Sequence, residues 1–131
     1  MSLLYLDASA LVKLIVQEAE SAALRAELTN WDELFSSIVS RVEVPRAVRR
    51  AQPGESSREI DAVLDPVSYI DIDMGLARAA SGLEPVGLRS LDAIHLATAL
   101  SLGDDLGAFA TYDARLSEAA TEHGIPVIAP T

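Results

Sequence analysis

Short apolar runs alternate with stretches of helical periodicity along this sequence. The run Leu3–Leu6 ends at Asp7 and is typical of a buried strand. From Ala8 onward the apolar positions recur at helical spacing, and a second amphipathic stretch covers Glu18–Leu28. Leu34–Ser36 follows and is typical of a short strand. The first part of the chain therefore predicts a strand, two helices and a second strand.

The next segment predicts two helices joined by a loop. Either Ser37 or Ser40 is expected to cap a helix that runs through Val48, because a serine hydroxyl accepts a hydrogen bond from a free N–H group of the first turn. Gln52–Ser57 has loop composition, and Ser57–Leu64 regains helical periodicity. We therefore expect this loop to connect two neighbouring helices.

The second half of the chain repeats the alternation. Ser90 is expected to cap the clearest helix, Leu91–Leu102, whose apolar residues share one stripe. The other predicted elements are a strand at Val67–Ile72, a helix at Met74–Ser81, a strand at Gly107–Thr111, a helix at Ala114–His123 and a last strand at Ile125–Ala129. This order predicts an α/β fold, a mainly parallel sheet of about five short strands with helices on both faces. Ligands of such sheets bind beyond the carboxyl ends of the strands.

Composition narrows the class of protein. The 131 residues fit one domain spanning residues 1–131, and with 50% hydrophobic residues the chain can bury a core. Cysteine is absent, which excludes disulfide scaffolds, cysteine zinc sites and thiol nucleophiles. The longest uncharged stretch, Ala93–Gly103, is shorter than the roughly 18 residues that cross a bilayer. The N-terminus lacks a basic region, so we expect a cytoplasmic protein without a secretory signal or a membrane partner.

The charge is unevenly distributed. The 10 basic and 20 acidic residues give a net charge of −10, which repels polyanions. Four arginines nevertheless fall within ten positions, at Arg41, Arg46, Arg49 and Arg50. With Arg89, these residues are candidates for contact with phosphate groups. Alternatively, the last three arginines of the strip form a solvated helix face.

Four acidic residues lie in positions that suit a ligand site: Asp7, Glu43, Asp92 and Asp113. Asp7 and Asp113 follow predicted strands, Asp92 begins a predicted helix, and Glu43 lies on a helix between apolar neighbours. Singly, each is accounted for as a helix cap, a partner of the helix dipole or a solvated carboxylate. Together in one cleft they would repel one another unless a cation were bound, and carboxylates favour hard ions such as Mg²⁺. Such an ion activates water for attack on a phosphodiester.

The four acids lie in longer blocks that carry a family resemblance. These blocks are Tyr5–Leu14, Ser40–Ala47, Leu88–Ala99 and Thr111–Leu116. In sequence and in order they resemble PIN-domain ribonucleases, and most closely the VapC-type toxins of toxin–antitoxin pairs. The likeness covers nearly the whole chain. It implies a three-layer PIN-like fold and a metal-dependent endoribonuclease that hydrolyses RNA with a metal-activated water.

The resemblance also implies a site and its partners. The metal, Mg²⁺ or Mn²⁺, would be held by the catalytic quartet Asp7, Glu43, Asp92 and Asp113. Ser9 and Thr111 match hydroxyl positions beside the family's site, and the candidates for binding RNA are Arg41, Arg46 and Arg89. Beyond the RNA substrate, the implied partners are a cognate antitoxin of the VapB type and a second copy of the chain in a homodimer.

The sequence also permits functions other than RNA cleavage. A non-catalytic module of the same fold would use the acidic pocket to hold a basic peptide, because a guanidinium can take the place of a metal. The pair Asp71 and Asp73 is similar to the aspartate pair of phosphotransferases, but the hydroxyl residue that such enzymes need soon afterwards is missing. A doubly wound phosphate-transfer domain such as a receiver is disfavoured, because it relies on a lysine near its site and Lys13 lies in the helix after the first strand. His95 lies one helical turn after Asp92, and we interpret it as a half-buried structural histidine. Pro45 departs from the family pattern and puts the direction of Glu43 in question.

Overall fold

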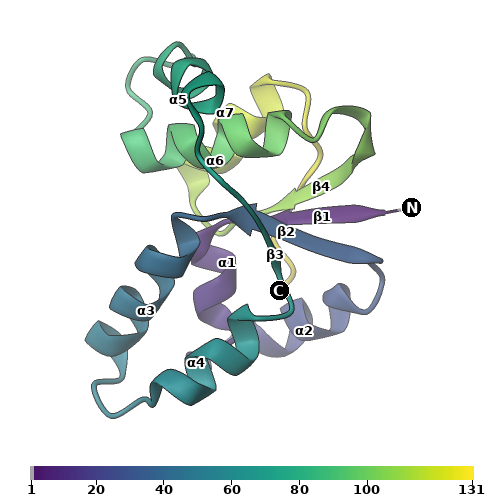
Figure 1. Cartoon of the computed structure of the whole chain (residues 1–131). Coiled ribbons are helices and arrows are strands. Elements are labelled where there is room, and N and C mark those ends of the chain that lie inside the picture. The colour runs from purple at the N-terminus through teal and green to yellow at the C-terminus, as the bar shows by residue number, and fades with distance from the viewer. Residues whose placement is uncertain (1) are drawn as a thin grey trace.

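A computed structural model describes residues 2–131 and contains one five-stranded parallel sheet (Figure 1). The strand order is β3-β2-β1-β4-β5, with all neighbouring pairs parallel. The strands are β1 (Leu3–Leu6), β2 (Glu33–Ser37), β3 (Ser68–Ile70), β4 (Leu106–Ala110) and β5 (Val127–Ile128). The predicted parallel sheet of about five short strands is therefore confirmed.

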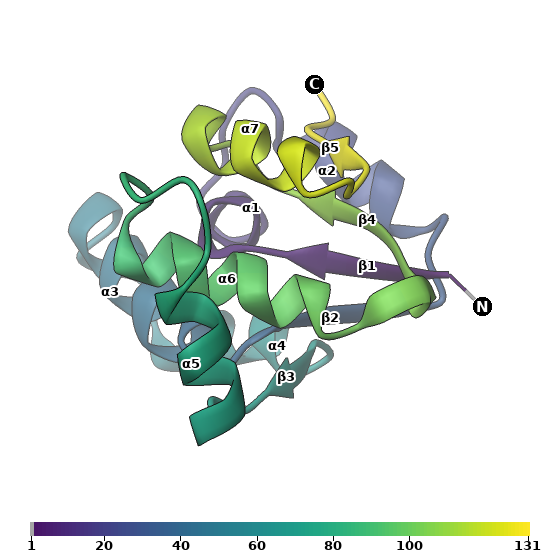
Figure 2. The same ribbon diagram turned by 90° about the horizontal axis from the view of Figure 1, so that it is seen from above.

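Helices cover both faces of the sheet (Figures 1 and 2). The helices are α1 (Ala8–Lys13), α2 (Ser21–Leu28), α3 (Ser40–Ala51), α4 (Ser57–Leu64), α5 (Met74–Ser81), α6 (Ser90–Leu100) and α7 (Ala114–Glu122), with a 3₁₀ turn at Gly103–Asp105. In Figure 1 the first four helices lie below the sheet and the last three above it. Figure 2 shows α6 alongside β1, with α5 nearer β3 and α7 nearer β4 and β5.

The central strand β1 joins the two halves of the core. Leu4 and Leu6 are fully buried against the helices below the sheet, in one cluster with Leu11 of α1. Tyr5 is buried in the cluster of the opposite face, together with Phe109. Successive side chains of a strand point to opposite faces of the sheet. Because helices cover both faces at β1, every residue of this strand is apolar, which is why the sequence shows an uninterrupted apolar run there.

Both predicted serine caps are wrong, the one at Ser37 or Ser40 and the one at Ser90. The residue before α3 is Val39, which already has helical backbone angles, and no side chain caps the helix. Ser40 is the first residue of the helix, and its hydroxyl lies 2.7 Å from that of Ser36, while Ser37 accepts a bond from the N–H of Val39. Ser90 is likewise inside α6 rather than before it. Ser37 and Ser40 do not cap α3 because their hydroxyls make hydrogen bonds within the preceding turn. Ser90 does not cap α6 because the helix already begins at this residue.

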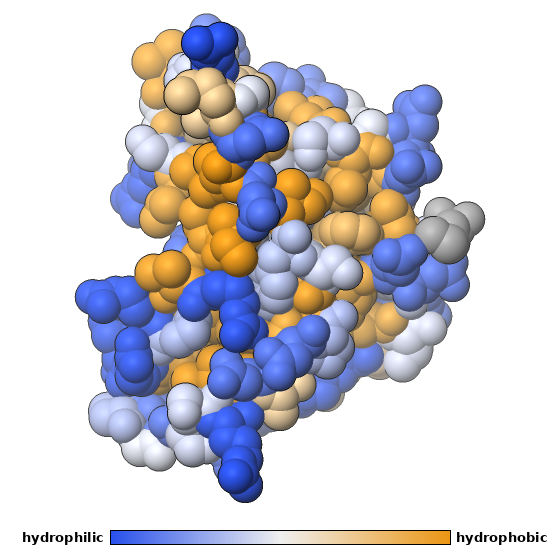
Figure 3. Space-filling view, in the orientation of Figure 1, coloured by the Kyte–Doolittle hydropathy of each residue, from blue (hydrophilic) through white to orange (hydrophobic). Residues whose placement is uncertain are grey.

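Apolar and polar side chains lie on different parts of the surface. In the view of Figure 3, apolar side chains gather beneath α5, while polar side chains dominate the lower half around α3 and α4. Among the helices of residues 2–131, none combines the length and the apolar character that crossing a bilayer would demand.

Candidate active site

Asp7 lies at the carboxyl end of β1, and hydrogen bonds hold both of its oxygens. Oδ1 accepts bonds from the Ser9 hydroxyl (2.7 Å) and from the N–H of Ala10 (3.0 Å), so the residue caps α1. Oδ2 accepts a bond from the Thr111 hydroxyl (2.6 Å). The side chain is only 3% exposed. Burial raises the pKa of Asp7, against the opposing effects of His95 and of these hydrogen bonds.

Asp113 occupies the equivalent position after β4, the neighbour of β1 in the sheet. Its Oδ1 accepts bonds from the N–H groups of Arg115 (2.9 Å) and Leu116 (3.0 Å) and caps α7. Its own N–H donates to the Thr111 hydroxyl (3.1 Å). The Ser9 hydroxyl accepts a bond from the N–H of Tyr112 (2.9 Å). Ser9 and Thr111 therefore tie together the two strand ends that carry the aspartates.

Asp92 brings the acidic residues into one electrostatic site. It lies in the first turn of α6 and is partly exposed. Burial raises its pKa, and the negative charges of Asp113, Asp7 and Glu43 raise it further. Like charges affect one another in this way only when they lie close together. The charges of Asp113, Asp7 and Glu43 therefore all act on Asp92, although the four acids come from four separate segments of the chain.

Glu43 is held by a buried histidine. Glu43 Oε1 lies 2.7 Å from His95 Nε2, and His95 Nδ1 lies 2.7 Å from the hydroxyl of Tyr5. Burial raises the pKa of Tyr5 well above its ordinary value, so the phenol keeps its proton. When the imidazole is neutral, Tyr5 donates to Nδ1 and the N–H is fixed on Nε2, where it donates to Glu43. His95 thus orients the carboxylate of Glu43.

This role of His95 was missed in the sequence. The prediction of a half-buried structural histidine understates its burial, since the residue is only 1% exposed. The spacing from Asp92 gave no sign of its partner, because Glu43 lies 52 residues away in the chain. A buried histidine whose two nitrogens both need partners is the signal that points to such a contact.

Pro45 leaves α3 uninterrupted. The helix begins at Ser40 and continues through Pro45 to Ala51, so the proline lies in the second turn. Proline removes one backbone hydrogen bond at such a position. Glu43 precedes it and directs its carboxylate to His95, which answers the question that the sequence raised about its direction.

The carboxylate oxygens of the four acids are the type of ligand that a hard divalent cation prefers. Both oxygens of Asp92 lack a hydrogen-bond partner within residues 2–131, as do Oε2 of Glu43 and Oδ2 of Asp113. Over the same residues, no three side chains of the types His, Cys, Asp and Glu are grouped closely enough to hold one ion together. Mg²⁺ needs only one or two direct carboxylate ligands and keeps several waters, so the free oxygens suit it by their chemistry.

The candidate RNA contacts differ in their surroundings. Arg41 forms ion pairs with Asp61 (3.4 Å) and Asp65 (3.3 Å) and lies over the ring of Tyr69. Arg46 and Arg89 are exposed and have no carboxylate within 4.0 Å in the described part of the chain. A guanidinium that has no carboxylate partner is more available to contact a phosphate than one that forms ion pairs. Arg46 and Arg89 are therefore better candidates for phosphate contact than Arg41.

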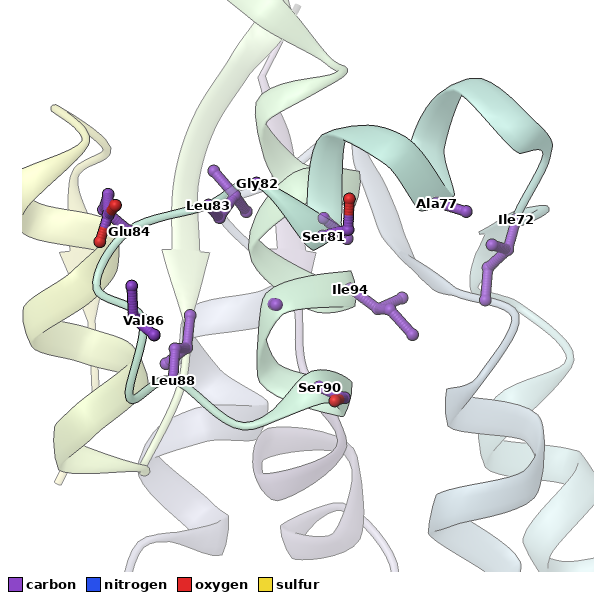
Figure 4. A pocket seen from close by; sticks show the side chains of 12 residues that line it. Ile72, Ala77, Ser81, Gly82, Leu83, Glu84, Val86, Leu88, Ser90 and Ile94 are labelled. Carbon is purple, nitrogen blue, oxygen red and sulfur yellow. The ribbon is translucent and has the colours of Figure 1, made fainter.

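A separate apolar pocket carries no comparable chemistry. It has a volume of about 530 Å³ and lies between α5, α6 and the segment before α6 (Figure 4). Its walls include Ile72, Leu83, Leu88 and Ile94, and its only titratable lining residue is Glu84. Of the pair Asp71 and Asp73, the second caps α5 by accepting a bond from the N–H of Leu76 (2.8 Å), so a structural role accounts for it.

With a chelator present, stability is expected to fall as pH rises from about 4 toward 7. Asp7 and Asp92 have raised pKa values in the folded state, so above the ordinary aspartate pKa of about 3.9 the folded protein holds more protons than the unfolded chain. Deprotonation in this range therefore favours unfolding. Urea unfolding at several pH values measures the effect, and Asp92→Asn should show a smaller fall than the wild type. An equal fall in both proteins would contradict the assignment to Asp92.

Comparison with known proteins gives consistent matches. The PIN domain family matches residues 4–122. Ribonuclease VapC46 of Mycobacterium tuberculosis (strain ATCC 25618 / H37Rv) is 46% identical over 132 aligned residues that cover 100% of both chains. The crystal structure of M. tuberculosis VapC20, a Sarcin-Ricin loop cleaving toxin, aligns with a TM-score of 0.75 at 14% identity and covers 97% of this chain and 99% of that chain. A toxin–antitoxin complex from Klebsiella pneumoniae aligns with a TM-score of 0.69 at 21% identity, covering 97% of each chain.

Proposed function

This chain belongs to the PIN domain family, and on that basis we propose that it is a metal-dependent endoribonuclease that acts as the toxin of a toxin–antitoxin pair. The observation that carries the proposal is that Asp7 and Asp113 cap the helices that follow β1 and β4 and are tied together through Thr111, while the charges of both, and of Glu43, act on Asp92 at the start of α6. The full-length relative named ribonuclease supports the same activity.

In this proposal the residues of the site have two roles, binding of the ion and positioning of the residues that bind it. Asp7, Glu43, Asp92 and Asp113 would hold Mg²⁺ or Mn²⁺ between them, one or two as direct ligands and the others through waters that the ion keeps. When bound, the ion lowers the pKa of a water and offsets charge on the phosphodiester. Asp7 is fixed by Ser9 and Thr111. His95 fixes Glu43, whereas both oxygens of the partly exposed Asp92 are free of hydrogen bonds within residues 2–131. The reaction adds water across a phosphorus–oxygen bond of RNA.

The partners follow from the same proposal. A cognate antitoxin of the VapB type would cover the site, since a protein with a net charge of −10 attracts a basic segment. The Klebsiella pneumoniae complex, in which a chain of this fold is part of a toxin–antitoxin assembly, supports this partner. In this scheme a basic peptide in the acidic pocket is the inhibitor. The homodimer is proposed from the family alone.

The test is cleavage of a mixed RNA pool with and without divalent ions. Added Mg²⁺ or Mn²⁺ should give discrete fragments, and chelation with EDTA should remove the activity, because the carboxylates alone repel the phosphodiester. Restoring the ion after chelation should restore cleavage, which controls for damage to the protein. Cleavage that persists in EDTA would refute the mechanism. Calorimetric binding of the ion without cleavage of any RNA would favour the non-catalytic module.

A further inference from the structure

Tyr112 lies between two residues of the candidate site and is bonded to helix α1. It directly follows Thr111, whose hydroxyl donates to Asp7, and directly precedes Asp113, which caps α7. The N–H of Tyr112 donates to the hydroxyl of Ser9 (2.9 Å) in the first turn of α1. A shift of Tyr112 therefore displaces its covalent neighbours, and with them the hydroxyl that holds Asp7.

Lys13 holds the ring of Tyr112 at the other end of α1. Its Nζ atom lies 4.8 Å from the centre of the ring, within the range of a cation–π contact. Ser9 and Lys13 are four positions apart in the helix, so their side chains lie on the same face. Tyr112 therefore lies along this face, with its N–H bonded to the first turn and its ring against the last residue of the helix.

Two carboxylates fix the ammonium group of Lys13 over the ring. Nζ lies 3.4 Å from Oε1 of Glu18 and 3.2 Å from Oε1 of Glu20, and the side chain of Lys13 is only 12% exposed. Both glutamates belong to the connection between α1 and α2. The hydroxyl of Tyr112 donates to the carbonyl of Pro130 (2.8 Å), which holds the far edge of the ring. Lys13 therefore joins two segments of the chain to the end of β4.

Lys13 lies near the acidic site without neutralising it. Lys13, Tyr112 and Glu43 line the same groove, yet within residues 2–131 only Glu18 and Glu20 have carboxylates within 4.0 Å of Nζ. The direct electrostatic effect of this ammonium group on a divalent ion is repulsion, which weakens binding of the ion. An effect that passes through the ring of Tyr112 instead strengthens binding, because it keeps the ligands in place. Removal of the charge therefore separates the two effects by sign.

We infer that Lys13 is a positioning residue of the proposed metal site and acts through the ring of Tyr112. Its cation–π contact holds the end of β4 against α1, and thereby holds Thr111 against Asp7 and keeps Asp113 in place. Ligands that are free to move bind an ion more weakly, because binding then has to order them. The inference rests on the proposed function, in which these acids hold the ion.

The test measures Mn²⁺ affinity by isothermal titration calorimetry on the whole chain without RNA. Lys13→Met keeps an unbranched side chain but loses the charge, and it should bind Mn²⁺ about threefold more weakly. Lys13→Arg keeps a cation that pairs with carboxylates and stacks on a ring, so its affinity should stay within about twofold of the wild type. In the double-mutant cycle with Tyr112→Leu, adding Lys13→Met should cause almost no further loss, because the ring on which Lys13 acts is absent.

The matched control is Arg25→Met, which removes the same charge from α2. Arg25 donates to Gln17 (3.0 Å) and to the carbonyl of Leu14 (3.5 Å), so this variant also loosens the connection between α1 and α2 but leaves the ring of Tyr112 untouched. It should bind Mn²⁺ at least as tightly as the wild type. Unchanged or tighter binding by Lys13→Met, an equal loss in Arg25→Met, or additive losses in the double mutant would each overturn the inference.

Two further outcomes keep the test decisive. If Tyr112→Leu does not fold, the sign of the change in Lys13→Met and its rescue by Lys13→Arg still decide the role of Lys13. If the Mn²⁺ affinities follow the expected pattern but the wild type cleaves no RNA, the ribonuclease proposal fails while the role of Lys13 stands. If RNA is cleaved but Lys13→Met binds Mn²⁺ as tightly as the wild type, only the role of Lys13 fails.

Discussion

Asp92→Asn is expected to lower the rate of RNA cleavage at least about 100-fold, which corresponds to roughly 2.7 kcal/mol of lost transition-state stabilisation. Asp92 is the candidate ligand with both oxygens free of hydrogen bonds within residues 2–131, so its carboxylate serves no cap and no structural contact there. Replacing it with an amide removes one negative charge from the ion site. The rate is measured with saturating Mg²⁺ on an RNA that the wild type cleaves.

The same substitution should leave the fold at least as stable as before. In the folded state burial and the charges of Asp113, Asp7 and Glu43 disfavour an ionised Asp92, and the amide removes that cost. The matched control is Asp104→Asn, which removes a charge from the exposed 3₁₀ turn before β4, at the opposite end of that strand. It should cleave RNA at the wild-type rate. A fully active Asp92→Asn protein would eliminate Asp92 from the mechanism.

His95→Leu is expected to lower both stability and activity. The substitution keeps an apolar side chain of similar size but leaves the buried hydroxyl of Tyr5 and the carboxylate of Glu43 without their partner. We expect a loss of about 2–3 kcal/mol in the free energy of unfolding. Cleavage should fall by about 10-fold to 100-fold, with a higher Mg²⁺ concentration needed for half-maximal rate, because an unrestrained ligand binds the ion less well.

Two further variants separate orientation from packing. Tyr5→Phe removes the hydroxyl but keeps the bond between His95 and Glu43, so it should cost about 1 kcal/mol and leave the Mg²⁺ requirement nearly unchanged. His123→Gln changes the other histidine, which lies at the end of α7, and should alter neither quantity. If His95→Leu lost stability but kept the wild-type Mg²⁺ dependence, its role would be structural only.

The pattern of apolar and polar residues was sufficient to predict the helices and strands of this fold. The bounds predicted for Leu3–Leu6, Ser57–Leu64 and Met74–Ser81 are those of β1, α4 and α5. These segments have sharp local boundaries, since Asp7 ends the first run and the side chains of Ser56 and Asp73 cap the two helices. Local chemistry and tertiary packing agree at such positions, and prediction is then reliable.

The errors have a different origin. The helix predicted over Leu91–Leu102 ends at Leu100, because the chain turns through Gly103 with a φ of 59° before entering β4. The last strand, predicted over Ile125–Ala129, is limited to Val127–Ile128 by its pairing with β4. The second correction depends on where a distant strand lies, which no local pattern records.

For the candidate site, too, some features were predictable from the sequence and others were not. Acidic residues at strand ends were visible in the sequence because the carboxyl ends of parallel strands meet at one edge. The contact between Glu43 and His95, and the ion pairs that engage Arg41, join residues at least 20 positions apart. Such contacts separate a free side chain from an occupied one, and they emerge only from the folded arrangement.

The hydrogen bond from Thr111 to Asp7 spans 104 positions of the chain. During synthesis the N-terminal aspartate leaves the ribosome early, whereas its partner and the capping aspartate of α7 follow only when most of the protein has been translated. A nascent chain therefore cannot complete the proposed catalytic centre while it is still short. For the proposed toxin this means that RNA cleavage is expected only once translation has nearly finished.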